Sequence, residues 1–332
     1  MLEIRDLDVA IGRHTIVSVE RLDIPAGTRL GIVGESGSGK TMTAMSIVGL
    51  QPSTAVVSGS VRFNDRELVG LSDRRLAEVR GRDIGVIFQD PAKALNPMMR
   101  VGRQVAEAIR LHMDLPRDRL RARVLQLLTQ VHLPDARTLM RRYPHQLSGG
   151  QQQRVLIAIA IACDPKLLIA DEPTTALDVT VQSGILSLLR ELSVERKMGL
   201  LFVSHDLGVI QTISEVIGVV YGGQLVELGP ARTVIRQARH RYTQALVSAN
   251  PGIADDEHLG EIVGRQLDVI PGSVPALDRF PSGCRFRGRC SAEIASCAQP
   301  PEISVAGDGH IFKCWNPIEV VAGSEGDLDA AS

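Results

Sequence analysis

A glycine-rich stretch between an apolar run and a helical pattern constrains this chain more than any other feature. It fits the pattern G-x-x-x-x-G-K-[ST] and consists of Gly34, Glu35, Ser36, Gly37, Ser38, Gly39, Lys40 and Thr41. The apolar run at 30–33 predicts a buried strand before it, and the apolar spacing at 41–50 predicts a helix after it. Glycines let backbone N–H groups close around phosphate oxygens, and the helix N-terminus adds partial positive charge there. The stretch therefore predicts a phosphate-binding loop, in which Lys40 reaches the β- and γ-phosphates and Thr41 offers its hydroxyl to Mg²⁺.

Composition limits the class of protein. The chain has 332 residues, enough for two domains, and its 44% hydrophobic and 23% charged residues are ordinary for a globular protein. A net charge of −1 gives no basic field, so we expect no nucleic-acid partner. The longest apolar run, at 155–162, is too short to span a membrane, and residues 1–6 lack a signal-peptide pattern. We therefore expect the chain on the cytoplasmic side, with any membrane link made through a partner.

Apolar periodicity predicts an α/β core. Residues 2–33 alternate apolar and polar positions, which indicates a small antiparallel sheet leading into a central strand. Later strands, separated by helical patterns, predict a parallel sheet with helices on its faces. These strands are expected at 83–89, 167–170 and 200–204, and two further strands, at 216–221 and 224–228, are expected to be joined at Gly222-Gly223.

Residues 91–162 have a helical pattern throughout, and residues 230–250 predict two more short helices. One charged face in the first of these segments is expected to meet solvent, although it would also suit an acidic partner. That face comprises Arg117, Asp118, Arg119, Arg121 and Arg123. Beyond residue 250 proline and glycine recur, which predicts a small loop-rich module, and 319–332 are expected to be poorly ordered.

Two further stretches carry chemistry. The strand at 167–170 ends in Asp171, placed to hold a Mg²⁺ shell, and Glu172, placed to polarise a water for in-line attack on a γ-phosphate. Ser148 and two glycines precede a long apolar helix, so the serine predicts an N-cap and the glycines expose N–H groups. This turn predicts a second anion-binding surface, and a simply well-capped helix is the alternative.

The run at 147–154, Leu-Ser-Gly-Gly-Gln-Gln-Gln-Arg, resembles the signature motif of ATP-binding cassette (ABC) ATPases. The order of the other motifs agrees with that family, since Gln89 precedes the signature and the carboxylate pair, the run at 175–178 and His205 follow it. The resemblance covers roughly residues 1–230. It implies an α/β P-loop ATPase fold, with a RecA-like parallel sheet core, an antiparallel β subdomain and a helical subdomain at about 91–162.

The resemblance also implies a role for each motif. Gln89 would touch Mg²⁺ and the attacking water and couple to a membrane partner, and Mg²⁺ would be held through Thr41, Gln89 and Asp171. His205 would contact the γ-phosphate and orient Glu172. Two cassettes would close head to tail around two ATP molecules, with Asp178 on the loop that crosses the interface. The surface presented to the partner's ATP would be formed by Ser148, Gly149, Gly150 and Gln151.

The sequence departs from the family at the adenine-binding position. The family stacks adenine on an aromatic residue near the N-terminus, whereas this chain has Ile11 or His14 there and no Phe, Tyr or Trp before Phe63. Which residue stacks on adenine is left open by the sequence. The catalytic set is unaffected.

Several runs resemble the oligopeptide/dipeptide and nickel importer branch of the family. They lie at 88–97, 143–148, 240–246, 270–275 and 283–290, and the third has Arg241 where the branch has proline. The branch implies a C-terminal peptide-importer region at 231–332. It also implies two transmembrane permease subunits, a second ABC ATPase subunit that is either a related chain or a second copy, and an extracytoplasmic binding protein acting indirectly.

Four of the five cysteines cluster in this tail. Cys284, Cys290, Cys297 and Cys314 have the spacing C-x5-C-x6-C-x16-C, whereas Cys163 stands in an apolar helix and is expected in the core. Four thiolates suit an iron–sulfur cluster, and structural zinc usually has a tighter first pair, so spacing alone does not choose. The importer branch is understood to carry a [4Fe–4S] cluster at such a tail. A zinc ion and unligated thiols are the alternatives.

These observations lead to one hypothesis and two alternatives. The chain is expected to be the ATP-hydrolysing subunit of a bacterial importer of di- or oligopeptides, at the cytoplasmic face of the cell membrane. An importer of nickel, glutathione or another small solute would share every feature named above. A non-transport ABC ATPase is the second alternative, although such proteins usually carry a long coiled coil or two cassettes, and this chain shows one cassette and no sustained heptads.

Overall fold

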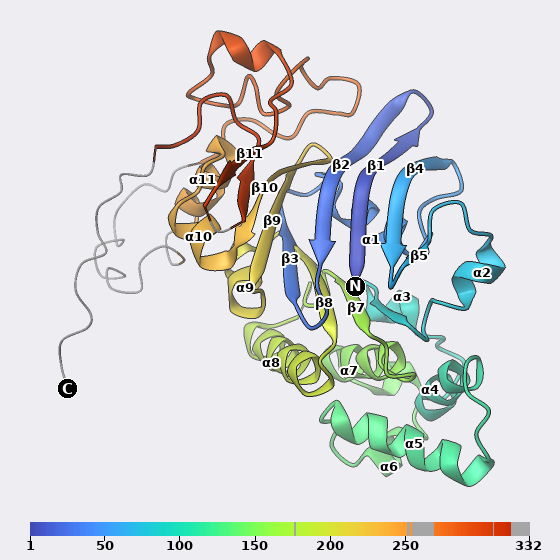
Figure 1. The fold of residues 1–332 in the computed structure, drawn as a ribbon. Helices are drawn as coiled ribbons and strands as arrows, with labels where there is room; N and C mark the ends of the chain where they lie inside the picture. The colour runs from blue at the N-terminus through green and yellow to red at the C-terminus, as the bar shows by residue number, and fades with distance from the viewer. Residues whose placement is uncertain (176, 251–252, 254–268, 308, 320–332) are drawn as a thin grey trace, which may run out of the picture.

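One mixed sheet runs through the computed structural model, which describes residues 1–175, 177–250, 253, 269–307 and 309–319 (Figure 1). The described strands are β1 (Leu2–Ile11), β2 (His14–Ile24), β3 (Arg29–Val33), β4 (Ala55–Phe63), β5 (Arg66–Glu67), β6 (Ile84–Ile87), β7 (Leu167–Asp171), β8 (Gly199–Ser204), β9 (Val216–Tyr221), β10 (Gln224–Pro230), β11 (Ser304–Ala306) and β12 (His310–Phe312). Their order across the sheet is β5-β4-β1-β2-β10-β9-β3-β8-β7-β6, with β12 joined to β10 and β11 to β12.

Helices lie between these strands and around the sheet (Figure 1). The described α-helices are α1 (Lys40–Ile47), α2 (Asp73–Ala77), α3 (Pro91–Ala94), α4 (Val101–Arg110), α5 (Arg117–Gln130), α6 (Ala136–Leu139), α7 (Gly149–Ala160), α8 (Val179–Arg196), α9 (Leu207–Ile213), α10 (Ala231–Arg236) and α11 (Arg241–Ser248). Two 3₁₀ turns are η1 (Pro144–Gln146) and η3 (Ala295–Ala298). None of the helices in the described part of the chain is long and apolar enough to cross a lipid bilayer.

Four neighbouring parallel strands position the site. β3 pairs with β8, β8 with β7 and β7 with β6, all in parallel. Alternate residues of β7 face opposite sides of the sheet, so Leu168 joins one apolar core and Leu167 the other. Every residue of β7 and β8 is buried, as expected for parallel strands covered on both faces. The predicted parallel core is therefore confirmed, and the carboxyl ends of these strands meet at one edge of the sheet.

The antiparallel part of the sheet also agrees with the sequence prediction. β1 pairs with β2 and β4, and β9 pairs with β10 across the turn at Gly222-Gly223. Both glycines of this turn have positive φ, at 56° and 80°, which a two-residue hairpin favours. A Cβ at Gly223 would lie 1.7 Å from the carbonyl oxygen of Ile16, so this turn needs glycine for close approach as well.

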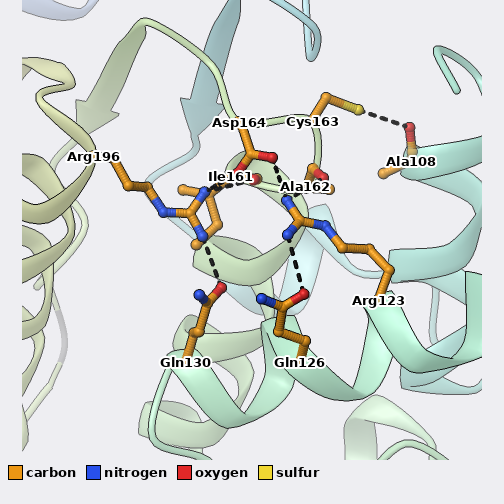
Figure 2. A network of polar contacts seen from close by, with 9 residues as sticks. All are labelled: Ala108, Arg123, Gln126, Gln130, Ile161, Ala162, Cys163, Asp164 and Arg196. Carbon is orange, nitrogen blue, oxygen red and sulfur yellow. Dashed lines mark hydrogen bonds and ion pairs between the residues drawn. The ribbon is translucent and has the colours of Figure 1, made fainter. Parts of the chain in front are cut away.

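The charged face predicted on 117–123 is wrong at one position. Arg123 is only 18% exposed and binds Asp164, with Nη2 2.6 Å from Oδ2 (Figure 2). Arg196, near the end of α8, holds the other oxygen of the same carboxylate, with Nη1 2.5 Å from Oδ1. Its second Nη donates to Gln130 at 2.7 Å. Because α5, the turn after α7 and α8 all enter this network, it fastens the helical segment to the core.

Cys163 lies beside this network and packs against the core, as predicted (Figure 2). Its sulfur lies 3.7 Å from the carbonyl oxygen of Ala108, to which it donates a weak hydrogen bond.

The tail adds a strand to the main sheet. β12 runs antiparallel to β10, with Glu227 opposite Phe312 and Leu228 opposite Ile311. The buried carboxylate of Glu227 accepts the backbone N–H groups of Arg239 and His240, at 2.7 and 2.9 Å, and lies 2.7 Å from the ring of His310. A boundary at residue 230 remains a prediction, because sheet and tail share these bonds. The predicted poor order at 319–332 falls, beyond residue 319, outside the described residues.

Candidate active site and comparisons

The phosphate loop leaves the carboxyl end of β3 and enters α1 (Figure 1). Gly37 and Gly39 have φ of 77° and 97°, a region that glycine reaches without strain. A Cβ at Gly34 would lie 2.1 Å from the carbonyl oxygen of Val220, so the loop also packs tightly against β9. The backbone thus has the conformation predicted for a loop that closes around phosphate.

Lys40 lies inside this loop and is 4% exposed. Its Nζ donates to the carbonyl oxygens of Gly34 at 2.8 Å and Glu35 at 2.9 Å. Burial lowers the pKa of Lys40, while the nearby carboxylates of Glu172, Asp171 and Glu35 act to raise it. An ammonium has three donors, so in the described part of the chain one remains for a phosphate oxygen.

Asp171, the last residue of β7, reaches the phosphate loop. Its Oδ1 accepts a hydrogen bond of 2.8 Å from Thr41 Oγ1. Burial raises the pKa of Asp171, and the bond from Thr41 opposes that rise. A hydroxyl and a carboxylate side by side are the hard oxygen ligands that Mg²⁺ prefers. These two residues therefore fit a magnesium ion.

Glu172 brings three sequence-predicted residues together. Its Oε2 accepts from Gln89 Nε2 and from Thr175 Oγ1, both at 3.0 Å, and its Oε1 lies 3.2 Å from His205 Nδ1. Gln89 follows β6 and His205 follows β8, so the edge formed by the parallel strands assembles the cluster. The Glu172 side chain is 14% exposed. Glu172 has a positive φ of 44°, which is uncommon for a residue with a side chain.

The turn at 148–151 lies at the start of α7. Ser148 Oγ accepts from the Gln151 N–H at 3.3 Å, and Gln151 Oε1 accepts from the Ser148 N–H at 3.1 Å, forming a capping box. Ser148 and Gly149 are exposed. A Cβ at Gly150 would lie 2.6 Å from Val181 Cγ1, so α8 approaches closely here. Asp178 caps α8 by accepting the Val181 N–H at 2.9 Å.

The two sequence-based candidates for the residue that stacks on adenine, Ile11 and His14, lie in the first hairpin. Ile11 ends β1 and is half-buried, and the exposed His14 begins β2 across the hairpin turn. Nearby, the carbonyl oxygen of Ile16 lies 3.4 Å from where a Cβ of Gly39 would stand. The hairpin therefore borders the phosphate loop, and the residue that stacks on adenine stays open.

Sequence reasoning missed two residues that contact the phosphate loop. Tyr242 of α11 accepts the Glu35 N–H at 2.8 Å. Arg289 of the tail pairs with the Glu35 carboxylate at 2.8 Å. Both residues lie within runs that resemble the importer branch, at 240–246 and 283–290, but no local pattern in the sequence connects either residue to position 35, because each contact spans more than 200 residues.

The four tail cysteines gather within the described region. Burial raises the pKa of the Cys284 thiol to about 11, and the neighbouring backbone of Phe286 and Arg287 opposes that rise. Burial likewise raises the pKa of Cys290 and of Cys314, and each of these thiols lies near enough to Cys297 to feel its charge. Within the described residues no group of three or more His, Cys, Asp or Glu side chains could hold a metal ion, so a cluster or zinc ion at these cysteines stays a prediction.

A buried lysine in a glycine loop, a threonine beside a strand-end aspartate, and a glutamate held by glutamine and histidine define a nucleotide-hydrolysing P-loop protein. The comparisons narrow this class. The family model for "ABC transporter" matches residues 18–175. The model for "Oligopeptide/dipeptide transporter, C-terminal region" matches residues 226–297.

Similar proteins and structures agree. A Brucella abortus protein named for peptide import and ATP binding is 46% identical over 286 residues, 86% of this chain and 84% of that one. The oligopeptide transport ATP-binding protein OppD of Salmonella typhimurium is 42% identical over 323 residues, 96% of this chain and 94% of that one. The dimeric, ADP- and Pi-bound cassette MJ0796 matches with a TM-score of 0.63 and 29% identity, over 70% of this chain and 99% of that one.

The chain belongs to the ABC transporter family of ATP-binding proteins. It is an ATPase of that family, and its tail is the C-terminal region found in the oligopeptide/dipeptide transporters.

Proposed function

We propose that this chain hydrolyses ATP to energise the import of di- or oligopeptides through a membrane ABC transporter. The observation that carries the ATPase part is the convergence of Gln89, Glu172 and His205 beside the phosphate loop. The peptide part is supported by the oligopeptide/dipeptide tail and by the relatives named for peptide import.

The residues around the loop are proposed to divide the chemistry. The N–H groups of residues 34–41 and Lys40 bind the triphosphate, and Glu172 accepts a proton from the water that attacks the γ-phosphate. Its bonds from Gln89 and Thr175 and its contact with His205 fix the carboxylate, so that one orientation is favoured. Thr41 and Asp171, with Gln89 from its position on Glu172, would hold Mg²⁺, which neutralises charge on the β- and γ-phosphates when bound.

Two cassettes are proposed to share each ATP. The turn comprising Ser148, Gly149, Gly150 and Gln151 presents a helix N-terminus on an exposed surface, which suits the γ-phosphate held by a second cassette. Asp178 would cross the interface beside it, since Gly150 and Val181 bring the two helix starts together. ATP would close the pair and hydrolysis would open it. The partner is a related chain or a second copy of this one.

The membrane partners are proposed to dock near Gln89. The adjacent Phe88 is 43% exposed and Met98, nine residues after Gln89 in the chain, is 85% exposed, so the segment at 88–98 offers apolar side chains to a partner. Two transmembrane permease subunits would contact this region at the cytoplasmic face of the membrane. An extracytoplasmic binding protein would choose the solute without touching this chain.

We also propose that Cys284, Cys290, Cys297 and Cys314 hold a [4Fe–4S] cluster rather than zinc. Four cysteines in one loop-rich tail supply the four thiolates that such a cluster takes. The tail also matches the C-terminal region of the oligopeptide/dipeptide transporters, the branch whose resemblance implies a cluster. When bound, a cluster would cross-link the loop-rich tail.

Anaerobic purification tests the cluster. We expect visible absorbance and about four irons per chain, both lost in Cys297→Ser and both kept in the matched control Cys163→Ser. Zinc without iron, or iron independent of Cys297, would contradict the proposal.

Solute uptake by the cells that make this chain tests the function. Replacing Glu172 by Gln in the genome should abolish uptake of labelled di- and oligopeptides while leaving nickel and glutathione uptake unchanged. Loss of nickel or glutathione uptake instead would assign the chain to another solute. If every uptake rate stayed normal, the transport proposal would fail.

A further inference from the structure

Arg289, directly before Cys290 in the tail, holds a residue of the phosphate loop. Its guanidinium forms a fork with the Glu35 carboxylate, with Nη1 2.8 Å from Oε2 and Nη2 3.0 Å from Oε1. The Arg289 side chain is only 8% exposed. Paired parallel bonds of this kind fix both direction and distance, which a single contact does not.

The tail and β9 hold the guanidinium in place. Its Nε donates to the Pro271 carbonyl oxygen at 2.6 Å, and Nη1 donates to Tyr221 Oη at 3.2 Å. The guanidinium also stands over the rings of Tyr221 and Phe286, 5.7 and 5.9 Å from their centroids. The guanidinium is therefore held in its orientation by contacts that do not involve Glu35.

The backbone of Glu35 is held as well. Its N–H donates to Tyr242 Oη at 2.8 Å, and its carbonyl oxygen accepts from Lys40 at 2.9 Å. Tyr242 is fully buried against Tyr221 and Phe286, with ring centroids 4.6 and 5.3 Å away. All three polar groups of Glu35 are therefore bonded. Its side chain is bound by Arg289 and its N–H by Tyr242, and both of these residues lie beyond position 230.

We propose that Arg289 is a positioning residue for the phosphate loop, through which the cysteine-bearing tail sets the affinity of the chain for ATP. The proposal rests on the proposed nucleotide-binding role of residues 34–41. A loop fixed in its binding conformation loses less entropy when ATP arrives. Arg289 also neutralises the Glu35 carboxylate, which would otherwise repel the triphosphate.

The tail's cysteines enter this arrangement through the chain itself. Arg289 and Cys290 are consecutive, and the Arg287 N–H donates to the Cys284 carbonyl oxygen at 3.0 Å, so the turn at 284–290 is one unit. Whatever orders the thiols therefore orders Arg289. Linkage is reciprocal for binding free energies, so ATP in turn stabilises the turn.

Equilibrium binding of a fluorescent ATP analogue to the full chain tests the proposal. We expect Arg289→Ala to weaken binding about tenfold or more and to raise KM, with kcat changed less than about twofold, since the Glu172 cluster is untouched. Arg289→Lys keeps the positive charge but cannot form both bonds of the fork, so its ATP affinity should lie between those of wild type and Arg289→Ala. The matched control is Arg287→Ala on the same turn, whose exposed partner is Glu293; it should bind normally.

Two further measurements separate positioning from folding. In a Glu35→Gln background Arg289→Ala should reduce ATP affinity much less than it does in wild type, because the carboxylate that Arg289 binds is already absent. Hydrogen exchange by mass spectrometry should show ATP protecting 284–290 in wild type and not in Arg289→Lys. If Arg289→Ala fails to fold, the Lys variant carries the test.

Three outcomes would overturn the inference. These are normal ATP affinity in both Arg289 variants, additive effects of Glu35→Gln and Arg289→Ala, and ATP protection that persists without the fork. Lys40→Ala distinguishes the two proposals, because it should lose ATP binding whatever Arg289 does. If Lys40→Ala bound ATP normally, the nucleotide-binding proposal itself would fail.

Discussion

Glu172 combines an uncommon backbone with a dense set of side-chain partners. Its φ of 44° costs roughly 1 kcal/mol or more for a residue with a Cβ. The surrounding contacts offset that cost, since its N–H donates to the Val203 carbonyl oxygen at 2.9 Å and its carboxylate meets Gln89, Thr175 and His205. The backbone turn aims the carboxylate at the edge where the phosphate loop begins.

At this scale we predict that Glu172→Gln separates hydrolysis from binding. Turnover of ATP should fall by at least about 100-fold, because a glutamine cannot accept the proton from water. ATP affinity should stay within about threefold, because Lys40 and the loop are unchanged. Steady-state phosphate release measures the turnover, and equilibrium ATP binding measures the affinity. The control Glu3→Gln changes an exposed glutamate on β1, and hydrolysis near the wild-type rate in Glu172→Gln would remove Glu172 as the base.

Residues of the phosphate loop could be predicted because their chemistry is local. Lys40 and Thr41 follow fixed glycines, and Asp171 ends an apolar strand, so spacing alone places them. Arg289 could not be predicted, since its partner lies 254 positions away and nothing around it marks an arginine that binds a loop. The prediction for Arg123 is wrong for a related reason. Its partner Asp164 lies 41 positions away, and binding it turns the side chain away from solvent.

The start of α11 depends on one neutral histidine. His240 is 1% exposed, and its Nδ1 accepts the Tyr242 N–H at 3.0 Å, which requires an unprotonated nitrogen. Burial lowers its pKa from 6.5 to about 4, and the nearby Glu227 carboxylate opposes that shift only in part. The unfolded chain therefore takes up a proton at a higher pH than the folded one.

We predict a loss of stability between pH 6.5 and pH 4 that depends on His240. The contribution is fully present above the unfolded pKa of 6.5 and is lost as the pH falls toward 4, amounting to about 3 kcal/mol. His240→Asn keeps a cap acceptor but removes the titration, so its free energy of unfolding should fall less over this range. Urea denaturation at several pH values measures it, with the exposed His14→Asn as control. Equal slopes in wild type and His240→Asn would contradict the assignment.

Elements with their own periodicity were predictable, and those stabilised by distant pairing were not. The hairpin at Gly222-Gly223 and helices α4, α5, α10 and α11 follow from turn residues and apolar spacing. β12 has three residues and no signal of its own, and it forms by pairing with β11 on one side and with Glu227 and Leu228 of β10 on the other. The sequence therefore predicts a separate module in the tail, although part of the tail belongs to the main sheet.

At the scale of the whole molecule, the exposed turn at 148–151 implies an assembly larger than one chain. We predict that Glu172→Gln dimerises in the presence of ATP and Mg²⁺, with the second cassette of its transporter if that is a different chain. Trapped ATP then joins two surfaces that neither cassette completes alone. Light scattering with and without ATP measures the mass.

Adding Ser148→Arg to this variant should abolish the dimer and leave ATP binding intact, because the side chain blocks the turn and lies outside the phosphate loop. The control Ser53→Arg changes another exposed serine. A chain that stays monomeric with saturating ATP and its partner cassette would contradict shared sites.

The strand β12 has a consequence for synthesis. Its His310 lies 83 residues after Glu227 in the chain, so the buried carboxylate and the part of β10 at Glu227 and Leu228 lack their partners until β12 has been made. A growing polypeptide that has released its catalytic motifs from the ribosome still presents an open β-edge to its neighbours. We therefore expect the nucleotide-binding half to complete its folding only once the tail has been made, because a nascent chain halted before residue 310 leaves Glu227 without the His310 ring.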